Sequence, residues 1–209
     1  MPEKTNLDKL KDEMEINPHE YLFRKVKKTA KTKFNCEYRL NLHTSISYWV
    51  INIASLLLIF VGIIEIVRQN NTSAIVVLSL VYSIFILVYS LILKSSNNQN
   101  IASEMNARAT ELLHLADQLQ PYCNNNNASI DVYRSFSDEY KNILLLSKEK
   151  SKRIDYELMK LDFKDYYELK WRHIAYIKVK YFLGFCHYFI VLLLLIFLII
   201  LFLWKGEYL

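Results

Sequence analysis

Three long apolar tracts constrain the fold of this chain more than any other feature. They cover roughly residues 45–67, 74–93 and 182–204. Each is close to the ~20 residues that a helix needs to cross the hydrocarbon core of a bilayer. Hydrocarbon offers no partner to a backbone N–H or C=O group, so such a segment must satisfy its hydrogen bonds internally as a helix. We therefore predict three transmembrane helices.

The rest of the sequence also favours helices. Of the 209 residues, 53% are hydrophobic and 22% are charged, and only three are glycine and three are proline. Long stretches consequently contain nothing that breaks a helix. We predict an all-α membrane protein whose cytosolic part is amphipathic and coiled-coil-like. Its predicted segments are a basic N-terminal helix (1–44), a two-span hairpin (45–93), a cytosolic helical region (94–181) and a third span with a short outer tail (182–209).

The distribution of lysine and arginine predicts the orientation of the spans. Ten of these residues precede Ser45, Arg68 alone lies between the first two spans, fourteen lie from Lys94 to Lys180, and Lys205 follows the third span. Positive residues are retained on the cytoplasmic side. We expect the N-terminus and the 94–181 region in the cytoplasm and the C-terminus outside. The first 44 residues are polar, so the first span is expected to be an uncleaved anchor.

A basic run precedes the first span. It consists of Arg24, Lys25, Lys27, Lys28, Lys31 and Lys33. We interpret it as a collar on the membrane surface, because each such charge near an anionic leaflet is worth ~1 kcal/mol. Nucleic-acid binding is the alternative, but a basic run alone does not favour it, and no direct nucleic-acid binding is expected.

Helix starts and apolar stripes divide the polar regions. Asn17 and Pro18 suit the N-cap and the first position of one helix, and Ser129 suits the N-cap of another. Pro121 is expected to end the helix before it. Apolar side chains recur at three- and four-residue steps in three stripes, over residues 101–119, 133–144 and 154–177. The third stripe is expected to lead into the last span, and the stripes are expected to pack within the chain or between subunits.

Polar and small residues gather on one face of the first span. They are Tyr48, Asn52, Ser55, Gly62 and Glu65, continuing a line that begins at Ser45. Small and hydrogen-bonding residues allow helices to pack closely in lipid. Polar groups inside a span also mark ion or substrate pathways. The line therefore predicts either helix packing at a subunit junction or the lining of a pore.

The sequence contains no recognised catalytic or metal-binding motif. Cys36, Cys123 and Cys186 form no C-x-x-C pair, and the five histidines occur singly. Three isolated glycines cannot form a Walker loop or a dinucleotide fingerprint. We expect no enzyme activity, no metal and no cofactor.

The layout resembles a known family. A basic helix enters a two-span hairpin, the second span leads into "IASEMNARATELLHLA", and a helix with "VYRSFSDEYKNIL" follows. This resembles the SLATT family of bacterial conflict-system membrane effectors, over residues 21–181. The third span marks the variant associated with reverse transcriptases. The resemblance implies a protein of the bacterial inner membrane that forms a pore, or otherwise disrupts the membrane, when an upstream sensor detects phage. That sensor would be a reverse transcriptase or a nucleotide-signal system.

Two hypotheses of function follow. The first is a homo-oligomeric antiphage effector of the abortive-infection type, in which the polar line of the first span conducts and depolarises the membrane. The second is a non-conducting membrane adaptor that presents its cytosolic helices to a partner. Tyr133, Arg134 and Tyr140 are the candidate partner contacts.

Overall fold

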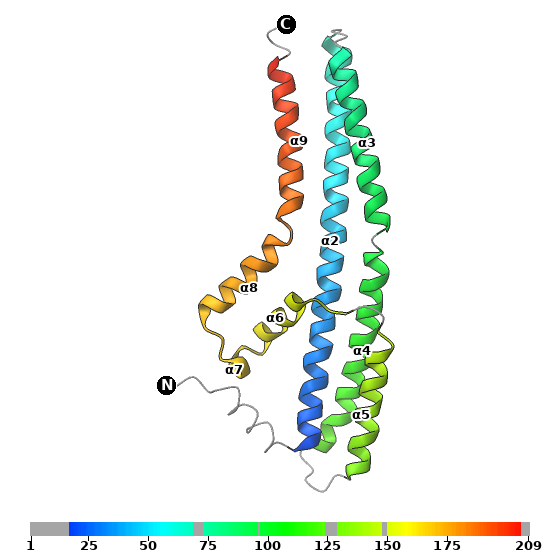
Figure 1. Cartoon of the computed structure of the whole chain (residues 1–209), viewed down its shortest axis with the longest axis vertical. Helices are drawn as coiled ribbons and strands as arrows, with labels where there is room; N and C mark the ends of the chain where they lie inside the picture. The colour runs from blue at the N-terminus through cyan, green and yellow to red at the C-terminus, as the bar shows by residue number, and fades with distance from the viewer. Residues whose placement is uncertain (1–16, 69–72, 96, 124–128, 148–149, 206–209) are drawn as a thin grey trace. The chain divides into compact units, whose positions relative to one another are not determined.

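A computed structural model describes residues 17–68, 73–95, 97–123, 129–147 and 150–205. All regular structure in these ranges is helical, which confirms the predicted fold class (Figure 1). The helices are α2 (Pro18–Arg68), α3 (Ser73–Ser95), α4 (Asn98–Cys123), α5 (Ile130–Leu145), α6 (Arg153–Asp162), α7 (Lys164–Tyr167), α8 (Trp171–Leu183) and α9 (Cys186–Lys205). The chain divides into two compact units. Unit 1 combines Met1–Arg39 with Asn100–Leu169, and unit 2 combines Leu40–Gln99 with Lys170–Leu209.

The predicted starts of α2 and α5 are confirmed. α2 begins at Pro18, and the Oδ1 atom of Asn17 accepts a hydrogen bond from the backbone N–H of His19 at 3.0 Å. α5 is capped by Ser129, whose side chain accepts from the backbone N–H of Asp131 at 3.1 Å. Both contacts satisfy donors that the first turn of a helix leaves without an intrahelical partner.

The core of unit 1 is formed by α2, α4 and α5. Its buried members are Leu22, Val26 and Ala30 from α2, Leu112, Leu115, Ala116 and Leu119 from α4, and Tyr140 and Ile143 from α5. These residues confirm the stripes predicted for residues 101–119 and 133–144. Removing one leucine-sized side chain from water contributes about 1.5–3 kcal/mol, so this shared core is what holds the three helices together.

The expected end of α4 at Pro121 is wrong, since the helix continues through Pro121 to Cys123. Proline has no N–H to bond to the carbonyl four residues earlier, and its ring crowds that carbonyl. Here that loss falls in the last turn of the helix. In the same turn the side chain of Asn17 donates to the backbone oxygen of Cys123 at 3.4 Å, which satisfies one of the terminal carbonyls.

The third stripe, expected to lead into the last span, is divided among several helices. Residues 153–183 form three helices, α6, α7 and α8, and Glu168 between the last two has a positive φ of 48°. A left-handed conformation at a non-glycine residue cannot be part of a right-handed helix. In α6 the buried residues are Asp155 and Met159, whereas the predicted stripe residues Ile154 and Leu158 are only partly buried.

Unit 2 contains the candidate membrane spans. Two helical stretches are long and apolar enough to cross a bilayer. They are Pro18–Ile64, in α2, and Ser79–Cys123, which includes most of α3. Trp171–Leu183 and Cys186–Leu193 meet at 45°, and together they are a third candidate span if this bent pair is counted as one. The buried residues Val50, Phe185 and Tyr188 pack together in this unit. His43 reinforces the contact, because its ring stacks on Phe185 with centroids 4.3 Å apart.

Candidate functional site

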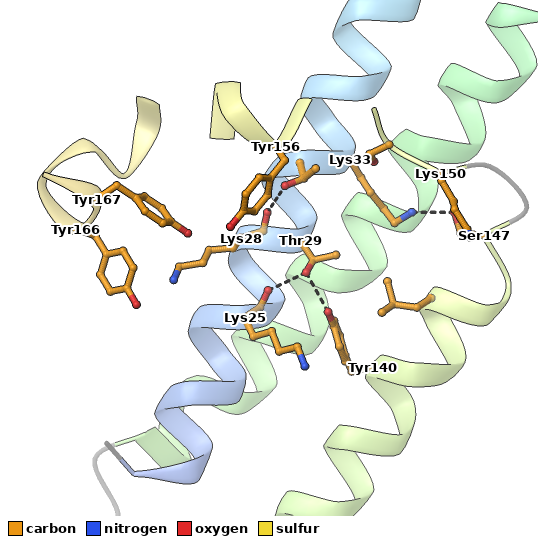
Figure 2. Close-up of a pocket in the computed structure, with 13 residues that line it drawn as sticks. Lys25, Lys28, Thr29, Lys33, Tyr140, Ser147, Lys150, Tyr156, Tyr166 and Tyr167 are labelled. Carbon is orange, nitrogen blue, oxygen red and sulfur yellow. Dashed lines mark hydrogen bonds between the residues drawn. The ribbon is translucent and has the colours of Figure 1, made fainter. Parts of the chain in front are cut away.

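Unit 1 contains a basic pocket of about 580 Å³ (Figure 2). Its lining residues come from α2, from α5 and from the chain between residues 147 and 167. They are Lys25, Lys28, Thr29, Thr32, Lys33, Tyr140, Leu144, Ser147, Lys150, Ser151, Tyr156, Tyr166 and Tyr167. We call this site the lysine pocket. Among these described lining residues are four lysines and no aspartate or glutamate.

α2 supplies most of the lysines because of its helical repeat. Lys25, Lys28 and Lys33 lie three and five residues apart, so Lys25 and Lys28 share one face and Lys33 extends it by more than a turn. Thr29 lies between them and donates to the backbone oxygen of Lys25 at 2.9 Å. Its hydroxyl also lies 3.0 Å from that of Tyr140, which joins α2 to α5 at the pocket wall.

Lys33 is the most buried of the pocket lysines, with 5% of its surface exposed. Its ammonium donates to the hydroxyl of Ser147 at 2.8 Å and contacts the sulfur of Met105 at 3.8 Å. Burial lowers the pKa of Lys33, because the charged form loses its hydration. Lys33 therefore lies inside unit 1, where its charge is held by few polar partners.

Aromatic rings form the other wall. The ammonium of Lys28 lies 3.7 Å from the centroid of Tyr166 and 5.2 Å from that of Tyr167, and Lys25 lies 5.5 Å from that of Tyr140. These are cation–π distances. Tyr140 is only 7% exposed, and burial raises the pKa of its hydroxyl. Figure 2 shows the α2 lysines and these rings arranged around the same space.

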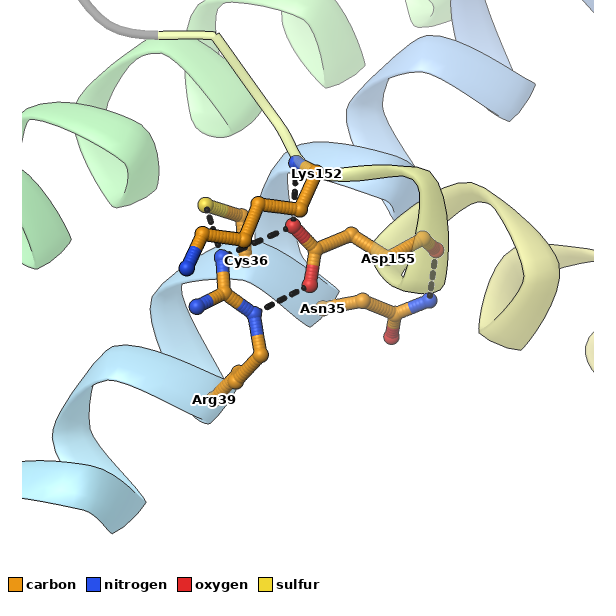
Figure 3. A network of polar contacts seen from close by, with 5 residues as sticks. All are labelled: Asn35, Cys36, Arg39, Lys152 and Asp155. Carbon is orange, nitrogen blue, oxygen red and sulfur yellow. Dashed lines mark hydrogen bonds and ion pairs between the residues drawn. The ribbon is translucent and has the colours of Figure 1, made fainter. Parts of the chain in front are cut away.

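A buried ion pair holds α6 against α2 (Figure 3). The Nε and Nη2 atoms of Arg39 donate to the two carboxylate oxygens of Asp155 at 2.7 and 3.0 Å. Asp155 is fully buried, and Arg39 is 5% exposed. The carboxylate also accepts from the backbone N–H of Lys152 at 2.8 Å, and Asn35 donates to the backbone oxygen of Asp155 at 3.2 Å. All four contacts fix the start of α6, which leads to the tyrosines of the pocket.

The structure separates the six residues of the predicted collar. Lys25, Lys28 and Lys33 line the lysine pocket. Arg24 pairs with Glu20 at 2.6 Å and Lys31 pairs with Asp162 at 3.2 Å, whereas the Lys27 ammonium lies 4.3 Å from the Phe23 ring centroid. Contacts within unit 1 therefore involve the whole run. For the exposed members, a role at the membrane surface stays a prediction.

The polar line of the first span lies largely on an uncovered face of α2. Tyr48 is 51% exposed and Asn52 is exposed, whereas Ser55 is half-buried and donates to the backbone oxygen of Ile51 at 2.9 Å. A Cβ added at Gly62 would meet no atom within 4 Å outside its own helical backbone. The side chain of Glu65 lies outside the described residues. The face of the span that packs within the chain includes Ser47, Val50, Ala54 and Val61.

The three predicted partner contacts differ in accessibility. The side chain of Arg134 is 73% exposed and pairs weakly with Asp131 at 3.9 Å. Tyr133 is half-buried against the core of unit 1, and its ring meets that of His19 edge-on. Because Tyr140 is buried in the core, only Arg134 presents a freely accessible side chain.

Sequence reasoning missed both the lysine pocket and the Arg39–Asp155 pair. In the sequence the lysines form a linear run, which carries no signal that they meet distant tyrosines. One signal was available for Asp155, since it lies four residues before Met159 on the face that becomes buried. In the described part of the chain, no three His, Cys, Asp or Glu side chains are grouped so that they could hold a metal ion.

The apolar helices together with a polar helical unit define a membrane protein of the helical class. The model of the SMODS and SLOG-associating 2TM effector domain family 5 matches residues 15–203 of the chain. The chain therefore belongs to this SLATT family, as the resemblance predicted, and it is a membrane effector domain by family. The match extends through the third apolar tract. No curated protein and no solved structure gave a match.

Proposed function

We propose that the protein is a homo-oligomeric effector of bacterial antiphage defence that depolarises the inner membrane when an upstream sensor triggers it. It acts without catalysing a reaction, with its N-terminus in the cytoplasm, and the abortive-infection outcome is arrest of the infected cell. Membership of an effector-domain family and the candidate membrane spans support this proposal. The proposed sensor is a reverse transcriptase or a nucleotide-signal system.

The observation that carries the proposal is the exposure of Asn52 on α2. An amide transferred to hydrocarbon without a hydrogen-bond partner costs roughly 2–7 kcal/mol. The hydroxyl of Ser55 already bonds to its own helix, but Asn52 is exposed on the face that the chain leaves uncovered. A second copy or a water-filled path would provide the missing partner. Either arrangement places the polar line at an oligomer axis or junction.

A flux assay with purified protein in liposomes tests the pore. Asn52→Leu is expected to abolish or strongly reduce ion flux and the loss of membrane potential in cells, while chemical crosslinking still traps the same oligomer. Ser83→Leu is the matched control, because Ser83 is an exposed hydroxyl on α3 that bonds to its own helix. Intact flux in the Asn52→Leu protein, or membranes that stay polarised while cells die, would refute a conducting polar line.

The non-conducting adaptor is the second candidate, and the construction of unit 1 favours it. This unit has its own core and a buried ion pair, as expected of a rigid platform that presents a surface to a partner. In that case Asn52 serves only helix packing. Asn52→Leu would then dissolve the oligomer, and the wild-type protein would pass no ions across liposomes.

A further inference from the structure

We propose that the lysine pocket binds a free small molecule that carries phosphate groups and a flat ring. All its described lining residues belong to unit 1, and none is a member of the polar line of the first span. The binding itself does not depend on the proposed function. If the protein is a triggered effector, the lysine pocket is a site where the trigger acts. Only this consequence rests on the proposed function.

The charges of the pocket select an anion. Lys25, Lys28, Lys33 and Lys150 contribute four ammonium groups around one cavity, and the described lining residues include no aspartate or glutamate. Phosphate oxygens are acceptors only, and ammonium groups are donors only, so their hydrogen bonds are charge-assisted. The hydroxyls of Thr29, Thr32, Ser147 and Ser151 add neutral polar groups to the same lining.

Lys33 explains why the anion would enter the pocket rather than remain at its mouth. The buried ammonium of Lys33 is destabilised by lost hydration. Its hydrogen-bond partners are the hydroxyl of Ser147 and the sulfur of Met105, and Glu104 adds a nearby negative charge. An anion that reached Lys33 would stabilise its charged form. A negative group that binds beside Lys33 would therefore be attracted by a buried ammonium.

The tyrosines select a flat ring beside the phosphates. Tyr156 is 45% exposed and Tyr166 is 37% exposed, and both line the cavity together with Tyr167. Partly exposed aromatic rings stack on nucleobases and similar rings. A base on Tyr166 would share that ring with Lys28, whose ammonium lies 3.7 Å from the ring centroid. The volume of about 580 Å³ falls in the range that holds drug-sized ligands. A nucleotide combines this size, the negative charge and the ring.

The aromatic lining favours a free molecule over a lipid headgroup. The headgroup of phosphatidylglycerol carries a phosphate but no aromatic ring that could stack on Tyr156, Tyr166 or Tyr167.

Binding to the purified full chain in uncharged detergent tests the proposal. Titration calorimetry at low ionic strength would compare ADP, inorganic pyrophosphate, adenosine and dioctanoyl phosphatidylglycerol. We expect saturable binding of ADP, weaker binding of pyrophosphate and none of adenosine. Lys28→Gln should weaken ADP binding by about tenfold, as expected for one lost charge-assisted bond. Tyr166→Leu should weaken ADP but not pyrophosphate.

Lys141→Gln is the matched control, since it removes the same charge from α5 at an exposed residue that pairs with Asp138 outside the pocket. Circular dichroism establishes that each variant is folded. The proposal is overturned if neither phosphate probe saturates, if only the lipid binds, or if Lys141→Gln weakens ADP as much as Lys28→Gln. Binding of ADP without any ion flux from liposomes would refute the pore and leave the pocket standing. Ion flux without binding of ADP or pyrophosphate would refute the ligand site and leave the pore standing.

Discussion

At the scale of single residues, Asp155 organises more of unit 1 than any residue singled out from the sequence. Its carboxylate holds Arg39 and the N-terminal turn of α6, and its backbone oxygen holds Asn35. Two buried charges lose their hydration, so the pair itself contributes little net stability compared with apolar residues of equal size. Its effect is to fix which face of α6 meets α2.

Removing one partner of this pair is therefore expected to cost far more than the pair contributes. Asp155→Ala leaves the Arg39 guanidinium buried without a counter-ion and should lower the free energy of unfolding by about 3–5 kcal/mol. Arg39→Met combined with Asp155→Leu should recover most of that loss. Denaturant titration of the protein in detergent measures both. Asp138→Ala, which breaks the exposed pair with Lys141, should change stability by only ~0.2–1 kcal/mol. Equal losses in the two alanine variants would contradict this account.

Cys36 offers a second test at the same scale. Burial and the nearby charge of Asp155 raise the pKa of its thiol to about 11, although Arg39 opposes the shift. Only the thiolate reacts with iodoacetamide. In a protein that lacks Cys123 and Cys186, alkylation at pH 8 should be much slower than for the same chain unfolded in guanidinium. The rate should rise about tenfold per pH unit towards pH 11. Mass spectrometry follows the reaction, and a rate that levels off near pH 9 would disprove the raised pKa.

At the scale of elements, local signals predicted the helix starts well and the interruptions poorly. Asn17 and Ser129 act within two residues of themselves, so the sequence alone shows what they can bond. The positive φ of Glu168 carries no comparable signal, because glutamate is an ordinary helix former. The lysine pocket depends on residues more than 100 positions apart, such as Thr29 and Tyr140, and so required the packed structure.

The N-cap of α5 allows a prediction about the stability of one helix end. Ser129→Ala removes the acceptor for the backbone N–H of Asp131 and should destabilise the start of α5 by about 1 kcal/mol. Ser129→Asp should retain the cap, because aspartate is an equally good acceptor at this position. Hydrogen exchange of the first-turn amides measures the effect, with exchange of the α4 amides as the internal control. Unchanged exchange in Ser129→Ala would show that core packing alone fixes this end of the helix.

At the scale of the whole molecule, the number of membrane crossings decides where the C-terminus lies. The family is described by two spans, yet the match reaches residue 203 and so includes most of α9, whose 20 residues would extend about 30 Å as a helix. That length equals the hydrocarbon thickness of a bilayer. The large apolar side chains of α9 that are exposed, among them Phe189, Leu193 and Phe197, suit lipid. These properties favour a third crossing by α9, with the bend at Gly184 and Phe185 between α8 and α9.

We therefore expect reporters fused after residue 209 to lie outside the cell membrane. Alkaline phosphatase, which is active only after export, should be active there, and green fluorescent protein should stay dark. The same reporters fused after Tyr181, before the third tract, should give the opposite result, since the preceding region carries the excess of basic residues. If both fusion points report the cytoplasm, α9 does not cross, and its exposed apolar face must instead be covered along the membrane surface or by another subunit. In that case the chain has the two crossings of its family description, and the polar line of the first span would have only α2 and α3 from each copy with which to form a pore.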